Sequence, residues 1–137
     1  MKKIIFFLSV ATILLQASNF RDGMLSYKDS NFKEAKDSFL RAISKDNSIQ
    51  ANYMLGKMYL YGEGMLPDRD KAIQYLKISV NAGNIRAKCF LSEAYLRNNT
   101  NKEEAVTLLR EGLGKNLTEC KRIARIYNIT IDKKVEK

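Results

Sequence analysis

Few residues of this chain have side chains suited to covalent or acid–base chemistry. The sequence has no histidine, which is the commonest general base and a frequent metal ligand. Histidine-based catalytic triads are therefore excluded, and two cysteines alone are too few for a usual zinc site. We predict no catalytic, cofactor-binding or metal-binding residues.

One short pattern could indicate a nucleophilic serine. Ser30 and Lys33 have the Ser-x-x-Lys spacing, which places a serine nucleophile near a lysine in enzymes that act on β-lactams. Neither a Ser-Asp-Asn nor a Lys-Thr-Gly element accompanies the pair. Because so short a pattern of common residues recurs by chance, we interpret Ser30 as a residue at the start of a helix.

The two cysteines, Cys89 and Cys120, could form one disulfide if the protein folds in an oxidising compartment. Neighbouring helices lie about 8 to 10 Å apart, however, which is wider than a relaxed disulfide tolerates. The sequence leaves both states open, a bonded pair and two free thiols.

The first residues have the layout of a secretory signal. Lys2 and Lys3 precede an apolar run over residues 4–15, and Ala17 and Ser18 follow as small residues. We predict a signal peptide over residues 1–18, cleaved after Ala17 or Ser18, and hence a periplasmic or secreted protein. An uncleaved membrane anchor is the alternative, but the run is shorter than the about 20 residues that a spanning helix needs.

The chain is basic, with a formal net charge of +9. Removal of Lys2 and Lys3 with the signal would leave about +7. Nucleic acid is an improbable ligand for an exported chain, so the charge favours a protein or peptide with an acidic segment, or an anionic cell-wall polymer. The sequence does not predict the oligomeric state.

An internal repeat predicts the fold. Three residues recur after 36 positions: Ala51, Leu55 and Tyr59 reappear as Ala87, Leu91 and Tyr95. Repeats of this length are typical of helical hairpins that stack, because one hairpin cannot bury its apolar face alone. We expect an all-α protein, an α/α superhelix of about three helical hairpins with a C-terminal capping helix.

Seven helices and two families of packing positions follow from the repeat. In the first helices of the hairpins, apolar, small and tyrosine positions recur as Leu55, Leu91 and Ile123; Gly56, Ser92 and Ala124; Tyr59, Tyr95 and Tyr127. In the second helices, the buried positions are Ala35, Ala72 and Ala105; Phe39, Leu76 and Leu109; Ala42, Ser79 and Gly112. The predicted helices are 19–29, 31–45, 48–61, 68–82, 84–97, 101–115 and 117–127. Together they form a repeat domain over 19–128, followed by a basic tail over 129–137 that we expect to fray, or else to serve as a short interaction tail.

Capping residues are predicted at several helix ends. Asn31 with Glu34, Asp68, and Thr100 with Glu103 have the residue types of helix starts. Gly83 and Gly114 suit helix ends, and Gly62 with Gly64 suits a loop that needs positive φ.

The middle hairpin resembles the Sel-one-like repeat family, a branch of the tetratricopeptide-like helical repeats. The residues that carry the resemblance are Ala51, Leu55, Gly56, Tyr59, Gly62, Gly64, Asp68, Lys71, Ala72, Tyr75, Gly83 and Asn84. Met65, Ser79 and Val80 depart from the family pattern. The resemblance weakens toward both ends of the chain.

The resemblance implies a non-enzymatic adaptor or scaffold for protein–protein interaction, here in the bacterial cell envelope. The cysteine-rich secreted bacterial branch is associated with penicillin binding and β-lactamase activity. A hydrolase or penicillin-binding protein that acts on β-lactams or peptidoglycan is therefore the alternative. In that branch the position of Cys89 pairs with a cysteine in the preceding helix, where this chain has Val80.

Tetratricopeptide geometry also predicts a docking groove on the inner face of the stack. The first helices of the hairpins should direct a mainly positive set of side chains into it: Tyr53, Lys57, Tyr61, Arg86, Glu93, Arg97, Lys121 and Arg125. Such a face could hold an acidic segment through arginine forks and tyrosine rings. A solvated helix surface without a partner is the alternative interpretation.

Overall fold

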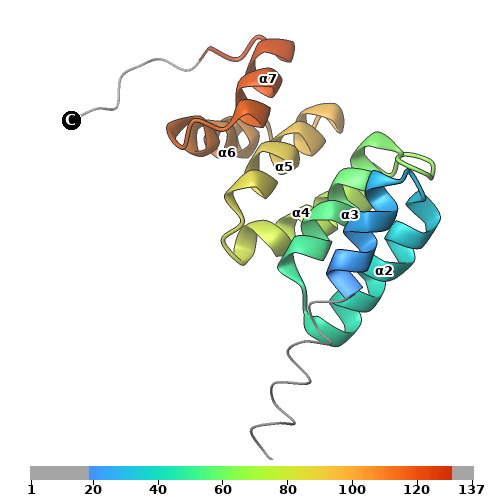
Figure 1. Ribbon diagram of the computed structural model, residues 1–137. Coiled ribbons are helices and arrows are strands. Elements are labelled where there is room, and N and C mark those ends of the chain that lie inside the picture. The colour runs from blue at the N-terminus through green and yellow to red at the C-terminus, as the bar shows by residue number, and fades with distance from the viewer. Residues whose placement is uncertain (1–18, 131–137) are drawn as a thin grey trace, which may run out of the picture.

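The computed structural model describes residues 19–130 (Figure 1). The predicted signal peptide and Lys133, Lys134 and Lys137 of the tail lie outside the described residues. Every regular element from 19 to 130 is a helix. A helix over 19–28 is followed by α2 (Phe32–Asp46), α3 (Ile49–Tyr61), α4 (Arg69–Asn81), α5 (Ile85–Arg97), α6 (Lys102–Gly114) and α7 (Thr118–Ile126).

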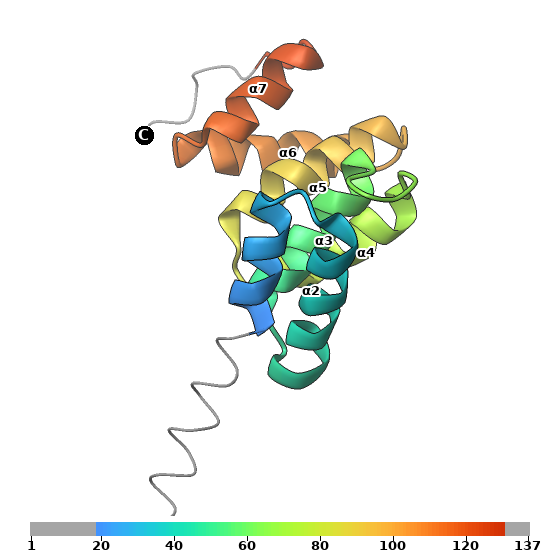
Figure 2. The same cartoon turned by 45° about the vertical axis from the view of Figure 1, so that its right-hand side comes forward.

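The helices form a stack of antiparallel hairpins, as the repeat predicts. Helix α4 packs against both α3 and α5, and α6 packs against α5 (Figures 1 and 2). Helix α7 covers the end of the stack by packing on α5 and α6. The all-α fold is therefore confirmed, and each helix begins and ends within about two residues of its predicted bounds. None of the helices between residues 19 and 130 has both the length and the apolar character needed to cross a membrane.

Both families of packing positions line the core, except that Ala124 and Tyr127 at the C-terminal end are only half-buried. Leu55, Leu91 and Ile123 are at most 1% exposed, and the alanines and large apolar residues of the second family are fully buried. Small residues permit close approach of the helices. A Cβ on Gly56 would lie 2.6 Å from Leu76 Cγ, so any side chain there would push α3 and α4 apart.

Two of the predicted helix caps are wrong, although the helices begin close to the predicted residues. Asn31 does precede α2, but its side chain accepts no capping hydrogen bond. The N-cap of α6 is Asn101, with a left-handed backbone, so Thr100 and Glu103 form no capping box. A capping side chain reaches the N–H groups only from an extended backbone. Asn31, with ψ 64°, and Asn101, with φ 46°, both depart from that conformation.

Three other helix starts carry side-chain caps. Asp68 accepts from the Lys71 N–H at 3.0 Å, which confirms that prediction. Ser48 accepts from the Ala51 N–H and Asn84 from the Ala87 N–H, each at 3.2 Å, and neither cap was predicted.

Residues with positive φ end several helices and shape the loops. Gly62, Gly64 and Gly83 have φ of 71°, 72° and 88°, as their predicted roles require. Gly114 differs from the prediction because it remains the last residue of α6, and Asn116 takes the left-handed conformation instead, with φ 61°. Asparagine adopts this region more readily than other side-chain-bearing residues.

Candidate functional site

Ser30 and Lys33 lie at the turn into α2. Ser30 has φ 62° and is exposed, and Lys33 is in the first turn of α2. Both line a shallow hollow of about 390 Å³ that also includes Phe32 and Gly64. In this described region no hydrogen bond joins the two side chains. The placement agrees with the interpretation of Ser30 as a residue at a helix start.

Cys89 of α5 and Cys120 of α7 form a disulfide, with their Cα atoms 4.9 Å apart. The general spacing of packed helices argued against the bond, and Gly112 of α6 explains why it forms here. A Cβ on Gly112 would lie 2.1 Å from Cys120 Sγ and 3.0 Å from Cys89 Sγ. The missing side chain leaves the space that the disulfide occupies, at a point where α5, α6 and α7 meet.

The predicted groove residues have different environments. Tyr53 is half-buried and packs edge-on against Phe90, with ring centroids 5.6 Å apart. Lys57 donates to Tyr27 Oη at 3.0 Å and lies 5.1 Å from the centre of that ring. Three further predicted residues are exposed: Arg86, Lys121 and Arg125.

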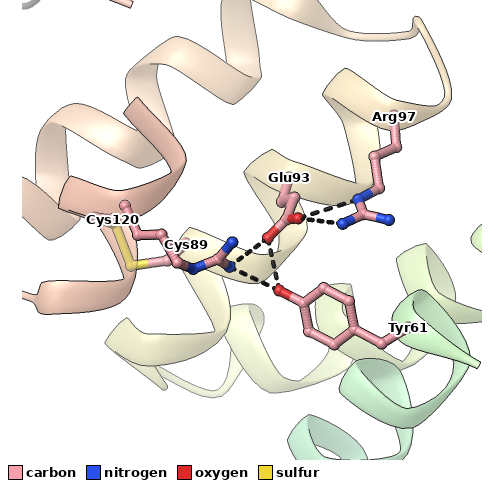
Figure 3. Close-up of polar contacts among 6 residues, drawn as sticks. Tyr61, Cys89, Glu93, Arg97 and Cys120 are labelled. Atoms are coloured by element: carbon pink, nitrogen blue, oxygen red, sulfur yellow. Dashed lines mark hydrogen bonds and ion pairs between the residues drawn. A yellow bond between two sulfur atoms is a disulfide. The ribbon is translucent and has the colours of Figure 1, made fainter. Parts of the chain in front are cut away.

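The other predicted groove residues meet around one carboxylate (Figure 3). Tyr61 Oη donates to Glu93 Oε2 at 2.6 Å. Arg97 forms a fork on Glu93 Oε1, with Nε at 3.0 Å and Nη2 at 2.7 Å. Arg122 Nη2 donates to both Glu93 Oε2 and Tyr61 Oη, each at 2.8 Å. We call these four residues the Glu93 cluster; they come from α3, α5 and α7.

The cluster joins a buried charge to partly exposed ones. The Glu93 side chain is 1% exposed, whereas those of Arg97 and Arg122 are 37% and 44% exposed. Burial acts to raise the pKa of Glu93, but hydrogen bonds from Tyr61, Arg97 and Arg122 outweigh it, so the pKa lies below its ordinary value. Burial and the hydrogen bond to Glu93 raise the pKa of Tyr61. At neutral pH the cluster therefore carries two positive charges and one negative charge.

Arg122 was not among the predicted groove residues, and Glu93 was predicted to face the groove. A signal was present in the repeat. Arg122 precedes Ile123, just as Met54 precedes Leu55 and Phe90 precedes Leu91. Met54 and Phe90 are buried, so a charged residue at the same repeat position in the last helix marks a change of role.

A metal-binding site would need a group of ligand side chains close together. Between residues 19 and 130, no group of three or more cysteine and acidic side chains is arranged to hold a metal ion. An open hollow of about 760 Å³ lies elsewhere, beside the loop before α4, and its lining includes Tyr59, Leu66 and Lys71.

Comparison with protein families addresses the middle hairpin. Residues 49–84 match the family model described as Sel1 repeat. This range contains α3, the loop with Gly62 and Gly64, and α4, and it agrees with the resemblance found in the sequence. No curated protein matches the chain. Sel1 repeats generally mediate protein–protein interactions and are typically non-catalytic.

Proposed function

We propose that this chain is an exported adaptor or scaffold that binds an acidic protein segment in the bacterial cell envelope. The observation that carries the proposal is the Sel1 repeat at 49–84, set within a stack of helical hairpins. Stacked repeats present extended surfaces that suit docking of another chain. The cysteine-rich branch of the family, with its hydrolase alternative, receives no specific support from the contacts of Ser30 and Lys33.

The charge of the surface favours an acidic partner. Arg97 and Arg122 are partly exposed beside Glu93, which is buried and already paired. Arg86, Lys121 and Arg125 are exposed on α5 and α7, and they outnumber Glu63 and Glu119, the acidic residues whose charges act on Tyr53. Opposite charge on a partner would speed encounter and fix its orientation. An anionic cell-wall polymer has similar charge, but it lacks the defined segment that a repeat surface selects.

The disulfide supports the exported location. Stable disulfides are usual in the periplasm and outside the cell and rare in the cytosol. Mass spectrometry of the protein from a periplasmic extract should give a chain that begins after Ala17 or Ser18 and contains no free thiol. An intact N-terminus and two free thiols in the cytosolic fraction would contradict export.

Docking can be tested by cross-linking the purified protein to an envelope extract, identifying the captured protein and reconstituting the pair. The double variant Lys57→Glu/Arg97→Glu should weaken the reconstituted complex at least tenfold, because two attractive charges become repulsive. The matched control is Arg110→Glu/Lys115→Glu, which should bind normally. Arg110 is an exposed residue of α6, and the exposed Lys115 directly follows that helix. Equal binding by both double variants would reject the surface. Nitrocefin hydrolysis and sedimentation with isolated sacculi test the hydrolase and the polymer-binding alternatives.

A further inference from the structure

Glu93 is the one fully buried charged residue of the described chain. It pairs with Arg97 and Arg122, so it reduces the positive charge that these arginines would present to an acidic partner. Burying a carboxylate is unfavourable unless it is paired and hydrogen-bonded. The contacts of Glu93 with Arg97 and Arg122 therefore have to explain why this carboxylate is buried here.

Glu93 holds both arginines in place. Two nitrogens of Arg97 bind one of its oxygens, and Arg122 binds the other. The Tyr61 ring lies 5.2 Å from the Arg97 guanidinium carbon and its hydroxyl accepts from Arg122, so the tyrosine fixes both side chains. Helices α3, α5 and α7 thus fix the two guanidinium groups relative to each other.

The arginines retain donors for a ligand. A guanidinium has five N–H groups on three nitrogens. Arg97 Nη1 and both Nε and Nη1 of Arg122 make no hydrogen bond within residues 19–130, and both side chains are partly exposed. Donors that are already ordered lose less side-chain entropy when they bind an anion.

We infer that the Glu93 cluster is a preorganised binding site for a carboxylate of an acidic peptide segment, with Arg97 and Arg122 as ligands of the anion and Glu93 as their positioning residue. This inference rests on the proposed function and specifies how the surface binds. The site keeps one net positive charge, which suits a single carboxylate.

The disulfide contributes to the same site. Arg122 lies two residues after Cys120, on a nine-residue helix whose only buried side chains are Cys120 and Ile123. Loss of the bond to Cys89 leaves α7 with few apolar contacts, so Arg122 is no longer held against Glu93. The site is therefore complete only in the oxidised protein.

The test measures fluorescence anisotropy of a fluorescein-labelled hexaglutamate peptide with the oxidised mature chain. Glu93→Gln makes the surface more positive, so general electrostatic attraction predicts tighter binding. Positioning by Glu93 predicts the opposite, about tenfold weaker binding, because both arginines lose their charged partner. Tighter or unchanged binding by Glu93→Gln would overturn the inference.

Further variants keep the test decisive if Glu93→Gln fails to fold. Arg122→Lys retains the charge and loses the planar fork, and we expect at least threefold weaker binding, whereas the matched control Arg110→Lys should bind as the parent does. Reduction with dithiothreitol should weaken binding by a similar factor. The site would be rejected if the Arg122→Lys, Arg110→Lys and reduced proteins all bound the peptide with the affinity of the oxidised parent. Amidating the C-terminus of the peptide should leave the affinity unchanged, because the side-chain carboxylates of the segment are bound; a loss of affinity on amidation would contradict this.

Failure of the carboxylate site can be distinguished from failure of the proposed docking function. If the partner captured from the envelope binds Glu93→Gln and Arg122→Lys normally but not Lys57→Glu/Arg97→Glu, docking holds and the carboxylate site is wrong. If no variant changes capture, the surface itself is wrong.

Discussion

Glu93 and Lys57 occupy equivalent positions 36 residues apart, yet they carry opposite charges. Each contacts the hydroxyl group of a tyrosine in the preceding first helix: Lys57 donates to Tyr27, and Glu93 accepts from Tyr61. The contact geometry is thus retained while the sign of the charge changes. At Glu93 the carboxylate binds Arg97 and Arg122 directly, whereas Lys57 meets a carboxylate only through Tyr27, whose hydroxyl donates to Glu63 Oε1 at 2.7 Å.

The lowered pKa of Glu93 predicts a pH-dependent contribution to stability. A carboxyl with a folded pKa below its ordinary value of 4.5 stabilises the fold above that value, and the contribution is lost as the pH falls through the folded pKa. The parent should therefore be more stable than Glu93→Gln at pH 7, with the gap narrowing below about pH 4.5. Urea unfolding at pH values from 7 to below about 4.5 measures this difference in the free energy of unfolding. Glu103→Gln, on the exposed start of α6, is the matched control. A gap independent of pH would contradict the assignment.

Gly112 and Gly114 offer a matched pair of substitutions in α6. Gly112→Ala places a methyl group against the disulfide sulfurs, and we expect a loss of about 1–3 kcal/mol in the free energy of unfolding, with some free thiol. Gly114→Ala meets no atom within 4 Å and has no positive φ, so alanine should be neutral or stabilising by up to about 1 kcal/mol. Denaturant unfolding and thiol titration distinguish the two. Equal stabilities of the two variants would show that α6 shifts to make room for a methyl group at residue 112.

Helix starts in this protein depend on backbone conformation as well as on residue type. Asn31 and Asn84 are both N-cap residues, but only Asn84 accepts a hydrogen bond from a backbone N–H of its helix. The backbone ψ is 64° at Asn31 and 103° at Asn84, so the side chain reaches the first turn only at Asn84. The loop before each helix sets this angle.

The two asparagines test the value of the cap. Asn84→Ala should lower the free energy of unfolding by about 1 kcal/mol, because the Ala87 N–H loses its acceptor. Asn31→Ala removes no capping bond and should change stability by only a few tenths of a kcal/mol. Thermal or urea unfolding of both variants supplies the comparison, and a larger loss for Asn31→Ala would refute this account of the caps.

Across the whole molecule, the stack has unequal ends. The cores of the first two hairpins are built from large apolar residues such as Phe39, Leu55 and Leu76, whereas the C-terminal core is the smaller cluster of Cys89, Leu109, Cys120 and Ile123. Ile129, assigned to the fraying tail, is half-buried and packs on this cluster. The disulfide ties the short α7 to α5 at this end of the described stack.

Removing the disulfide should therefore destabilise the molecule from its C-terminal end. Cross-linking residues 31 positions apart is worth about 3–4 kcal/mol by the chain-entropy estimate. We expect Cys89→Ala/Cys120→Ala to lose about that much in urea unfolding, and α7 amides to exchange hydrogen faster than those of α3. Uniform exchange rates and unchanged stability would contradict the role of the bond.

Periodicity was sufficient to predict the seven helices, their pairing and the buried residues, because each depends on apolar and small side chains that repeat along the chain. Gly62 and Gly64 were likewise recognisable, since glycine readily adopts positive φ. Contacts between α5 and α7 were beyond such reasoning. The disulfide depends on space left by Gly112 of a third helix, and the partners of Glu93 depend on how far Tyr61 and Arg122 reach across the stack. These distances follow from the packing angles of several helices at once, which no local spacing encodes.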